Sequence, residues 1–159
     1  MRPLDPDLFR HVLGHFCTGV TIVTSVDNGE PVGFTSQSFA SLSLDPPLVT
    51  FAVARTSKSW PRIQATGKFC ANVLAHDQEE LSRQFSVSGA DKFAGVDFTL
   101  SPAGCPVLGS VLAWIDALTV GVHEGGDHSI IVGEVTDLAI NRDTDPLLFY
   151  QGGYGRFSR

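Results

Sequence analysis

Two long strand-forming segments, separated by only a few turn residues, constrain this fold more than any other feature. Residues 111–124 and 129–140 are rich in β-branched and apolar residues, and Gly125-Gly126-Asp127 joins them as a tight hairpin. Further segments of β character lie at residues 20–26, 31–41, 48–54, 68–75, 98–101 and 147–151. So many strands usually close into a barrel, because closure removes exposed edges.

Two or three short helices are expected outside this barrel. The first covers residues 5–16, which repeat apolar residues at helical spacing behind Asp5 as a candidate cap. The second runs from Ser59, a candidate N-cap, to about residue 65. The third covers about residues 77–85 and begins with a capping-box pattern. The expected fold class is therefore mostly β, with peripheral helices.

Length and charge narrow the function classes. The chain has 159 residues, so residues 1–159 are expected to form a single domain. A net charge of −6 argues against nucleic-acid binding, which needs lysine and arginine to replace phosphate counterions. No apolar run approaches the ~20 residues that span a bilayer, and no signal-peptide pattern occurs. A cytoplasmic protein with no membrane partner is the expectation.

The cysteines predict neither a disulfide framework nor a metal site. Cys17, Cys70 and Cys105 are an odd number and form no CxxC pair. The histidines show no ligand spacing with them, so no metal is expected. The three cysteines are expected to be small buried residues.

The segment from Gly33 to Pro47 is the first candidate site. A half-buried strand should alternate apolar and polar residues, but Thr35 to Ser38 places four polar residues in a row. Either a ligand uses these groups or the strand is a solvent-exposed edge, since buried polar groups without partners are costly. The residues alone leave both interpretations open.

Three further segments carry candidate chemistry. The run from Arg55 to Ser59 offers hydroxyls and cations before a helix, which suits a phosphate or a simple solvated helix start. Asp127 beside His128 suits an oriented imidazole or an incidental turn histidine. The aromatic and glycine-rich tail, residues 149–157, suits stacking on a flat ring or a frayed terminus.

Several nucleotide and hydrolase motifs do not occur in the sequence. There is no GxGxxG after a strand, no GxxxxGK[ST] loop and no GxSxG elbow. A nicotinamide dinucleotide would therefore be held without a Rossmann fold.

The ordered set of segments resembles the short-chain flavin reductases of two-component flavin-dependent monooxygenases. The resemblance covers about residues 9–157, and its most specific parts are Gly33 to Ser43 followed by Pro46-Pro47, and Gly126-Asp127-His128. It implies an FMN-binding split β-barrel of Greek-key type and a homodimer. It also implies a flavin whose ring is contacted mainly by backbone groups.

The resemblance also implies roles for individual residues. His128 matches the histidine beside the nicotinamide, and thus the catalytic position. Flavin binding is implied for Thr35, Ser36, Gln37, Ser38, Ser41, Leu42 and Ser43, with Ser57, Lys58 and Ser59 at the flavin phosphate. Ring or tail contacts are implied for Phe85 and Phe93, and nucleotide contacts for Tyr154 and Arg156.

The implied activity is transfer of a hydride from NADH to FAD or FMN, which supplies reduced flavin to a separate monooxygenase. FAD against FMN stays open, because both flavins share the ring and the first phosphate. NADH rather than NADPH is implied only by the resemblance. Two alternatives also remain: a flavin-binding electron-transfer protein without NADH turnover, and a non-redox split barrel that binds another ligand. Since the two cofactors carry the reactive atoms, no catalytic acid or nucleophile is required of the protein.

Overall fold

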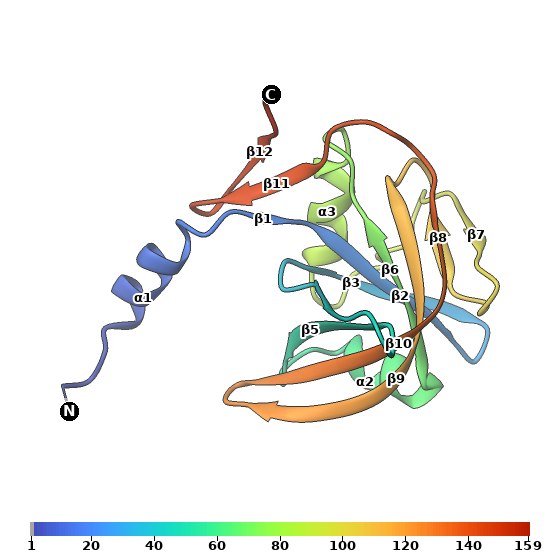
Figure 1. Ribbon diagram of the computed structural model, residues 1–159, viewed down its shortest axis with the longest axis horizontal. Helices are drawn as coiled ribbons and strands as arrows, with labels where there is room; N and C mark the ends of the chain where they lie inside the picture. Colours follow the sequence, from blue (N-terminus) through green and yellow to red (C-terminus); the bar gives the residue numbers. More distant parts are fainter. Residues whose placement is uncertain (1) are drawn as a thin grey trace.

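The computed structural model describes residues 2–159, and it is mostly β with three short helices, as expected (Figure 1). The helices are α1 (Pro6–Leu13), α2 (Trp60–Thr66) and α3 (Glu79–Ser86). The strands are β1 (Thr18–Gly19), β2 (Thr21–Asp27), β3 (Glu30–Ser36), β4 (Ala40–Ser43), β5 (Leu48–Ala54), β6 (Lys68–Val73), β7 (Phe98–Leu100), β8 (Pro106–Leu108), β9 (Ala113–Gly125), β10 (His128–Ile140), β11 (Leu147–Tyr150) and β12 (Gly153–Arg156).

A seven-stranded antiparallel sheet forms the body, in the order β3-β2-β6-β9-β10-β5-β4. Its two edge strands, β3 and β4, follow one another in the chain, so residues 37–39 pass from one edge to the other. Ser38 ties this crossing to β5, since its Oγ accepts from Ala52 N at 2.8 Å and lies 3.0 Å from Ala52 O. The sheet is therefore a barrel split between β3 and β4.

The predicted long hairpin is β9–β10, and it supplies the longest strands of the barrel. Gly126 has φ +73° at its turn, a conformation that glycine adopts without strain. Two register shifts bend the hairpin, one of them between Val132 and Gly133. The Phe69 ring packs over Gly133, where an added Cβ would lie 2.5 Å from the ring. A larger residue at this bend would displace the barrel core.

Two apolar clusters lie on opposite faces of the sheet. The inner cluster fills the barrel around Phe51, Phe69 and Ile131, and Trp60 of α2 packs edge-on against Phe51. The outer cluster is covered by α3 and includes Phe85, which is fully buried. Because β2 contributes to both clusters, its residues from Thr21 to Ser25 are all buried, without the alternation of a half-exposed strand.

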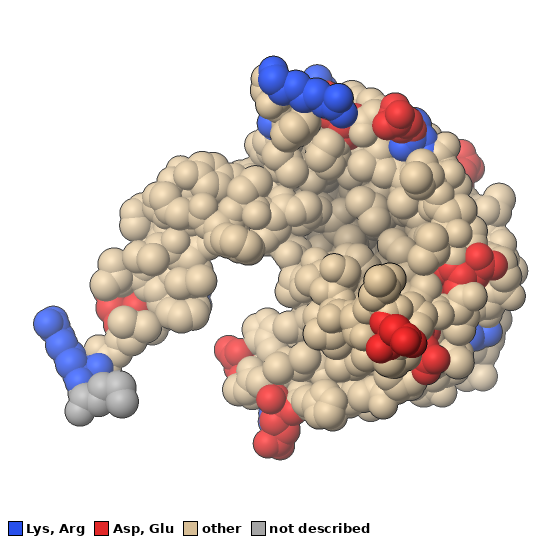
Figure 2. Space-filling view, in the orientation of Figure 1, with Lys and Arg blue, Asp and Glu red and all other residues tan. Residues whose placement is uncertain are grey.

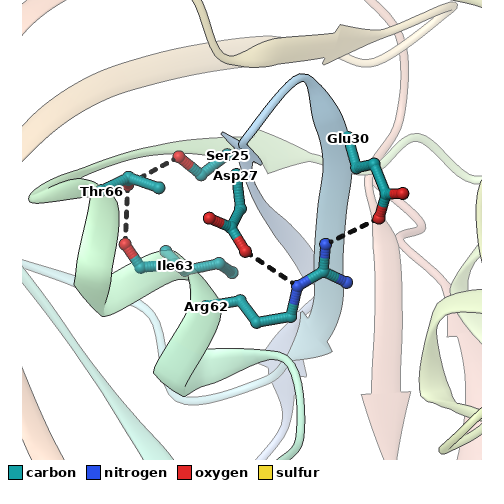
Figure 3. Close-up of polar contacts among 6 residues, drawn as sticks. All are labelled: Ser25, Asp27, Glu30, Arg62, Ile63 and Thr66. Carbon is teal, nitrogen blue, oxygen red and sulfur yellow. Dashed lines mark hydrogen bonds and ion pairs between the residues drawn. The ribbon is translucent and has the colours of Figure 1, made fainter.

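Helix α2 is fixed against the β2–β3 hairpin by polar contacts (Figure 3). Arg62 donates to Asp27 and Glu30, each at 3.1 Å, and Ser25 Oγ lies 2.9 Å from Thr66 Oγ1. These carboxylates raise the pKa of the Arg62 guanidinium. The helix therefore presents one fixed face toward the β9–β10 hairpin.

The N-terminal segment projects from the barrel as an arm, defined here as residues 4–19 (Figure 1). Asp5 caps α1, since its carboxylate accepts from Asp7 N at 3.0 Å. The arm is held at its base, where β1 pairs with β11 and Gln151 N donates to Gly14 O at 2.8 Å. No residue of α1 is buried.

Several sequence predictions were wrong in detail. The single strand expected over residues 31–41 is two strands, because the chain crosses the split at residues 37–39. The tail, for which the sequence left a stacking surface and a frayed terminus both open, is not frayed, because β12 pairs with β11. The capping box at α3 does not form, since Asp77 binds Arg142, and Gln78 is the N-cap residue without a side-chain bond to the helix.

Cysteine burial was also predicted only in part, because Cys70 and Cys105 are buried but Cys17 is exposed. Burial raises the pKa of both buried thiols. Within residues 2–159, no helix is long and apolar enough to cross a membrane.

Candidate functional site

A groove of about 1160 Å³ opens where the barrel is split. One wall is the base of the arm, and the others are the β3–β4 crossing and β5 (Figure 1). Among residues 2–159, no aspartate, glutamate, lysine or arginine lines it, and the hollow beside the arm in Figure 2 shows no charged residue. We call it the main groove; it is lined by residues 16–21, 34–41 and 52–54 with Ser57, Val73 and His128.

Protein groups use the hydroxyls of the polar segment. Thr35 Oγ1 donates to Ser82 O of α3 at 2.7 Å, and Ser36 Oγ lies 3.2 Å from Ser38 Oγ. Ser38 is already bound to Ala52, as described above. These side chains therefore fix the polar segment to α3 and β5, and they are not unsatisfied groups that await a ligand.

Backbone amides at the crossing are the free donors of this segment. Within residues 2–159, the N–H groups of Gln37 and Phe39 have no protein acceptor, although both residues line the main groove. Backbone N–H groups are strong donors that need a partner once water is displaced. An uncharged groove with such donors along one edge fits a flat heteroaromatic ring that carries carbonyl and ring-nitrogen acceptors.

The three residues expected at the flavin phosphate, Ser57, Lys58 and Ser59, differ in their burial and in their position relative to the main groove. Ser57 Oγ accepts from Trp60 N at 3.1 Å, so its own hydrogen is free to donate into the main groove. Ser59 is half-buried nearby and caps α2 without a side-chain bond to the helix. Lys58 is exposed, and neither Lys58 nor Ser59 lines the groove.

Sequence analysis missed Lys92, which the fold brings to Ser59. Lys92 Nζ donates to Gly33 O and to Ser59 Oγ, each at 3.2 Å. Within the described chain no carboxylate lies within ion-pair distance of this amine, and its burial lowers its pKa. A half-buried ammonium without a counter-ion is a suitable partner for an anion. The contact joins residues 33 positions apart, so no local sequence pattern indicates it.

His128 lies where β10 begins and pairs with Ala54 of β5, so it lines the groove beside the turn that carries Ser57. Its Nδ1 is 2.7 Å from Asp127 Oδ1, and this contact lowers the pKa of the Asp127 carboxyl. Because a carboxylate can only accept, Nδ1 carries the hydrogen and Nε2 is the ring atom left for a ligand.

The remaining predicted residues lie outside the main groove. Leu42 is exposed in β4 and Ser43 ends that strand. Phe85 is fully buried beneath Gly33, and Phe93 packs edge-on against it with ring centroids 4.9 Å apart. Neither ring reaches the groove.

The two tail residues border a different hollow with His76 and Glu80. The Tyr154 hydroxyl lies 2.7 Å from Ser82 Oγ, so the ring is anchored on α3. Arg156 is exposed at the end of β12. The structure therefore does not bring the tail to the groove that holds the other candidates.

The arm wall was not anticipated either. Phe16, Cys17 and Thr18 line the main groove, although the sequence predicts only that a helix ends at Phe16. Across residues 2–159 no group of three or more histidine, cysteine, aspartate or glutamate side chains could hold a metal ion.

Comparisons with known proteins show which proteins this chain resembles. The family described as "Flavin reductase like domain" matches residues 13–158. The reductase subunit HsaB of a flavin-dependent monooxygenase from Rhodococcus jostii is 53% identical over 151 residues, which are 95% of this chain and 77% of that protein. The FMN reductase (NADH) SmoA of Agrobacterium fabrum is 44% identical, over 95% of this chain and 86% of that protein.

A solved structure shows the same fold. Nitrilotriacetate monooxygenase component B from Mycobacterium thermoresistibile superposes with a TM-score of 0.93 at 49% identity, over 96% of this chain and 86% of that chain.

Proposed function

The chain belongs to the flavin reductase-like family, and on that premise we propose that it transfers a hydride from NADH to a flavin in the main groove. The observation that carries this proposal is the uncharged groove at the split, with the free backbone amides of Gln37 and Phe39 along its edge. The relatives named as an FMN reductase (NADH) and as a monooxygenase reductase subunit support both substrates. The 159 residues are proposed to belong to a single domain.

The protein contributes position and electrostatics to this reaction. When bound, the flavin supplies the hydride acceptor and the nicotinamide supplies the hydride. The amides of Gln37 and Phe39 donate to the acceptor atoms of the flavin ring, which stabilises negative charge that develops there. Ser36 and Ser38 fix the crossing that carries these amides, since their hydroxyls contact each other and Ser38 bonds Ala52 of β5.

The phosphate end of the flavin is assigned to Ser57, Ser59 and Lys92. The two hydroxyls donate, and the Lys92 ammonium supplies the charge that the groove otherwise lacks. Lys58, which the resemblance implies at the phosphate, stays a prediction. Because its side chain is exposed, its contact with the phosphate is expected to be weaker than that of Lys92.

His128 is proposed to hold the nicotinamide. Asp127 fixes the imidazole with hydrogen on Nδ1, so Nε2 accepts from the carboxamide N–H group of the nicotinamide. The histidine orients the ring and moves no proton in the hydride step. Tyr154 and Arg156 remain proposed nucleotide contacts only if the tail moves on binding.

The protein is further proposed to be a homodimer. Leu8, Phe9, Val12, Leu13 and Phe16 are each at least half exposed on the arm, and a monomer rarely exposes so continuous an apolar face. A second copy offers matching apolar surface on β9–β10, where Leu118, Val120, Leu138 and Ile140 are exposed. Since the arm walls the main groove, dimerisation would also fix the width of the site.

The dimer is tested by light scattering after size exclusion. Phe9→Asp with Val12→Asp should give a monomer, while Asp7→Ala on the polar side of the same helix should leave the mass unchanged. A monomeric mass for the unmodified protein would contradict the proposal.

The downstream partner is proposed to be a separate flavin-dependent monooxygenase, which receives the reduced flavin. The relatives that are reductase subunits of such systems support this assignment. The open groove, with few large side chains across it, favours release of the product.

The activity is tested by adding NADH and free FAD or FMN to the purified protein in air and following the NADH absorbance band. Consumption with either flavin is expected. If the protein retains flavin but consumes no NADH, the electron-transfer alternative replaces this proposal. If the protein neither retains flavin nor consumes NADH, the alternative of a non-redox barrel that binds another ligand replaces this proposal.

A further inference from the structure

Strands β1, β11 and β12 form a small sheet outside the barrel, and this sheet contacts two walls of the main groove (Figure 1). At one end, Thr18 and Gly19 of β1 line the groove as part of the arm wall. At the other end, β12 contacts α3, the helix whose backbone accepts from Thr35 of the polar segment. The small sheet therefore lies between the arm wall and the polar segment.

A continuous series of contacts runs from one end to the other. Thr18, Phe149 and Tyr154 are direct neighbours across the three strands. The Tyr154 hydroxyl lies 2.7 Å from Ser82 Oγ of α3, and Ser82 O accepts from Thr35 Oγ1 at 2.7 Å. Within the described chain, no other side-chain hydrogen bond joins β12 to the rest of the protein. Tyr154 is therefore the joint between the small sheet and α3.

The arm wall and the polar segment also meet directly, which closes this series into a ring. Two residues after β1, Thr21 pairs with Ser36 in the β2–β3 ladder, and its Oγ1 donates to Ser36 O at 3.2 Å. The chain leaves this corner through β1 on one side and through the β3–β4 crossing on the other. A tie across the outside of a corner fixes the angle between its two sides. The Tyr154 contact is placed to set how the arm wall stands relative to the polar segment.

The partners of the Tyr154 hydroxyl and ring are themselves held in place. Ser82 is fully buried, and a buried hydroxyl needs a hydrogen-bond partner within the protein. The Tyr154 ring packs edge-on against Phe149, with ring centroids 5.2 Å apart, and the Arg83 guanidinium lies 4.9 Å from its centroid. A ring fixed on two sides gives its hydroxyl one position, so loss of the hydroxyl releases α3 from the small sheet.

We propose that Tyr154 is a positioning residue of the flavin site. Through Ser82 it holds the arm wall and the polar segment at the spacing that the bound flavin ring requires, and it touches neither flavin nor nicotinamide. This inference rests on the proposed function, since it takes the main groove as the flavin site. It gives Tyr154 a role in the position that the structure describes, in which it does not line the main groove.

Dissociation constants of FMN and riboflavin, measured by fluorescence quenching, test this role. Tyr154→Phe removes only the hydroxyl and should weaken both flavins by the same factor, about two- to ten-fold, as for one lost neutral hydrogen bond. The factors should be equal because the two walls enclose the ring that both flavins share. Ser82→Ala should have the same effect, and the double variant should bind no more weakly than either single variant, because all three lose one contact.

Tyr150→Phe is the matched control. Tyr150 is the other tyrosine of the chain and lies on β11 of the same sheet, and its hydroxyl makes no hydrogen bond within the described residues. This change should leave both dissociation constants as they are in the unmodified protein.

Cys17 gives a second readout, because it lies on the arm wall, away from the substituted residue. At flavin concentrations that saturate each variant, Cys17 should react faster with a thiol reagent in Tyr154→Phe than in Tyr150→Phe. The reason is that an arm wall released from α3 no longer stands fixed against the bound ring.

A purely structural role for Tyr154 predicts a different pattern. Tyr154→Phe would then lower the midpoint of unfolding in urea but leave the flavin constants and the Cys17 rate of the folded protein unchanged, which would overturn the proposal. A raised KM for NADH with unchanged flavin constants would also overturn it, because Tyr154 would then contact the nucleotide. So would a double variant in which the two single effects multiply, since Tyr154 and Ser82 would then act independently.

These outcomes differ from failure of the proposed function itself. In that case the unmodified protein would bind no flavin or would consume no NADH, whatever the variants do.

Discussion

Replacement of Lys92 by methionine should selectively weaken binding of the flavin phosphate. Two of the three N–H donors of the Lys92 ammonium are accounted for by Gly33 O and Ser59 Oγ, each at 3.2 Å. The third is free, and no carboxylate neutralises the group within the described residues. A bound phosphate would supply both the missing acceptor and the missing charge.

The expected loss of FMN affinity follows from the strength of a hydrogen bond between the half-buried ammonium and the phosphate. A hydrogen bond to a charged group is worth about 1.5–3 kcal/mol, so Lys92→Met should raise the dissociation constant of FMN about 10- to 150-fold. Lys58 is exposed, and an exposed ionic contact is worth about 0.2–1 kcal/mol, so Lys58→Met should raise it less than about five-fold.

Fluorescence titration with FMN and with riboflavin separates the phosphate from the ring. Riboflavin lacks the phosphate, so its affinity should be the same in Lys92→Met and in the unmodified protein. Riboflavin therefore controls for any general damage to the groove. If riboflavin binding falls as much as FMN binding, or if Lys58→Met has the larger effect on FMN, the assignment of Lys92 to the phosphate is refuted.

The pH dependence gives a second readout of the same contact. Burial lowers the pKa of Lys92, so its ammonium loses the proton at a lower pH than an ordinary lysine. FMN affinity should therefore fall as the pH rises through that lowered pKa, while riboflavin affinity stays level. Lys92→Arg should keep its charge and remove this alkaline fall. An identical alkaline profile in Lys92→Arg would contradict the role of the lysine charge.

Three further predictions concern other parts of the molecule. His128→Ala should raise the KM for NADH and leave flavin affinity nearly unchanged in titrations; an equal loss of both would show that the residue is misplaced. Cys17 alone should react with a thiol reagent in the folded protein, because Cys70 and Cys105 are buried, and saturating flavin should slow that reaction; unchanged labelling with flavin would place the ligand away from the arm. Phe85→Ala should lower the free energy of unfolding by about 3–5 kcal/mol in urea, as for other buried aromatic residues, and a loss under about 1 kcal/mol would contradict its place in the outer cluster.

Much of the barrel is predictable because its strands are encoded by local patterns. The Leu48–Ala54 strand has the predicted bounds, and the Gly126 turn joins β9 and β10 as expected. Asn28 and Gly29 adopt positive φ at the first hairpin, as an Asn-Gly pair favours. Each of these elements depends on residues that are neighbours in the chain.

The errors occur where distant residues compete with local signals. Asp77 has a capping-box partner three residues away, but Arg142 binds its carboxylate in bidentate fashion and α3 begins without that cap. The polar run at Thr35 to Ser38 looks like a set of unsatisfied groups in the sequence. Its hydroxyls find acceptors only after α3 and β5 are in place.

Part of the candidate site could also be predicted from local sequence patterns. Gln37, Ser57 and His128 do line one groove, since each stands at the end of a strand or in a turn that the barrel brings to the split. Lys92 was missed because only the folded chain brings its loop to Ser59. Phe85 and Tyr154 were assigned to the ligand by resemblance, but their side chains pack in or on the outer cluster.

The central claim is that a flavin in the main groove accepts a hydride directly from NADH. Its most direct test mixes the protein, without oxygen, with equal amounts of NADH and flavin and follows both absorbance bands. The account predicts that the flavin band bleaches as the NADH band disappears, one molecule for one, far faster than without protein. A flavin band that persists while NADH remains unconsumed would contradict it.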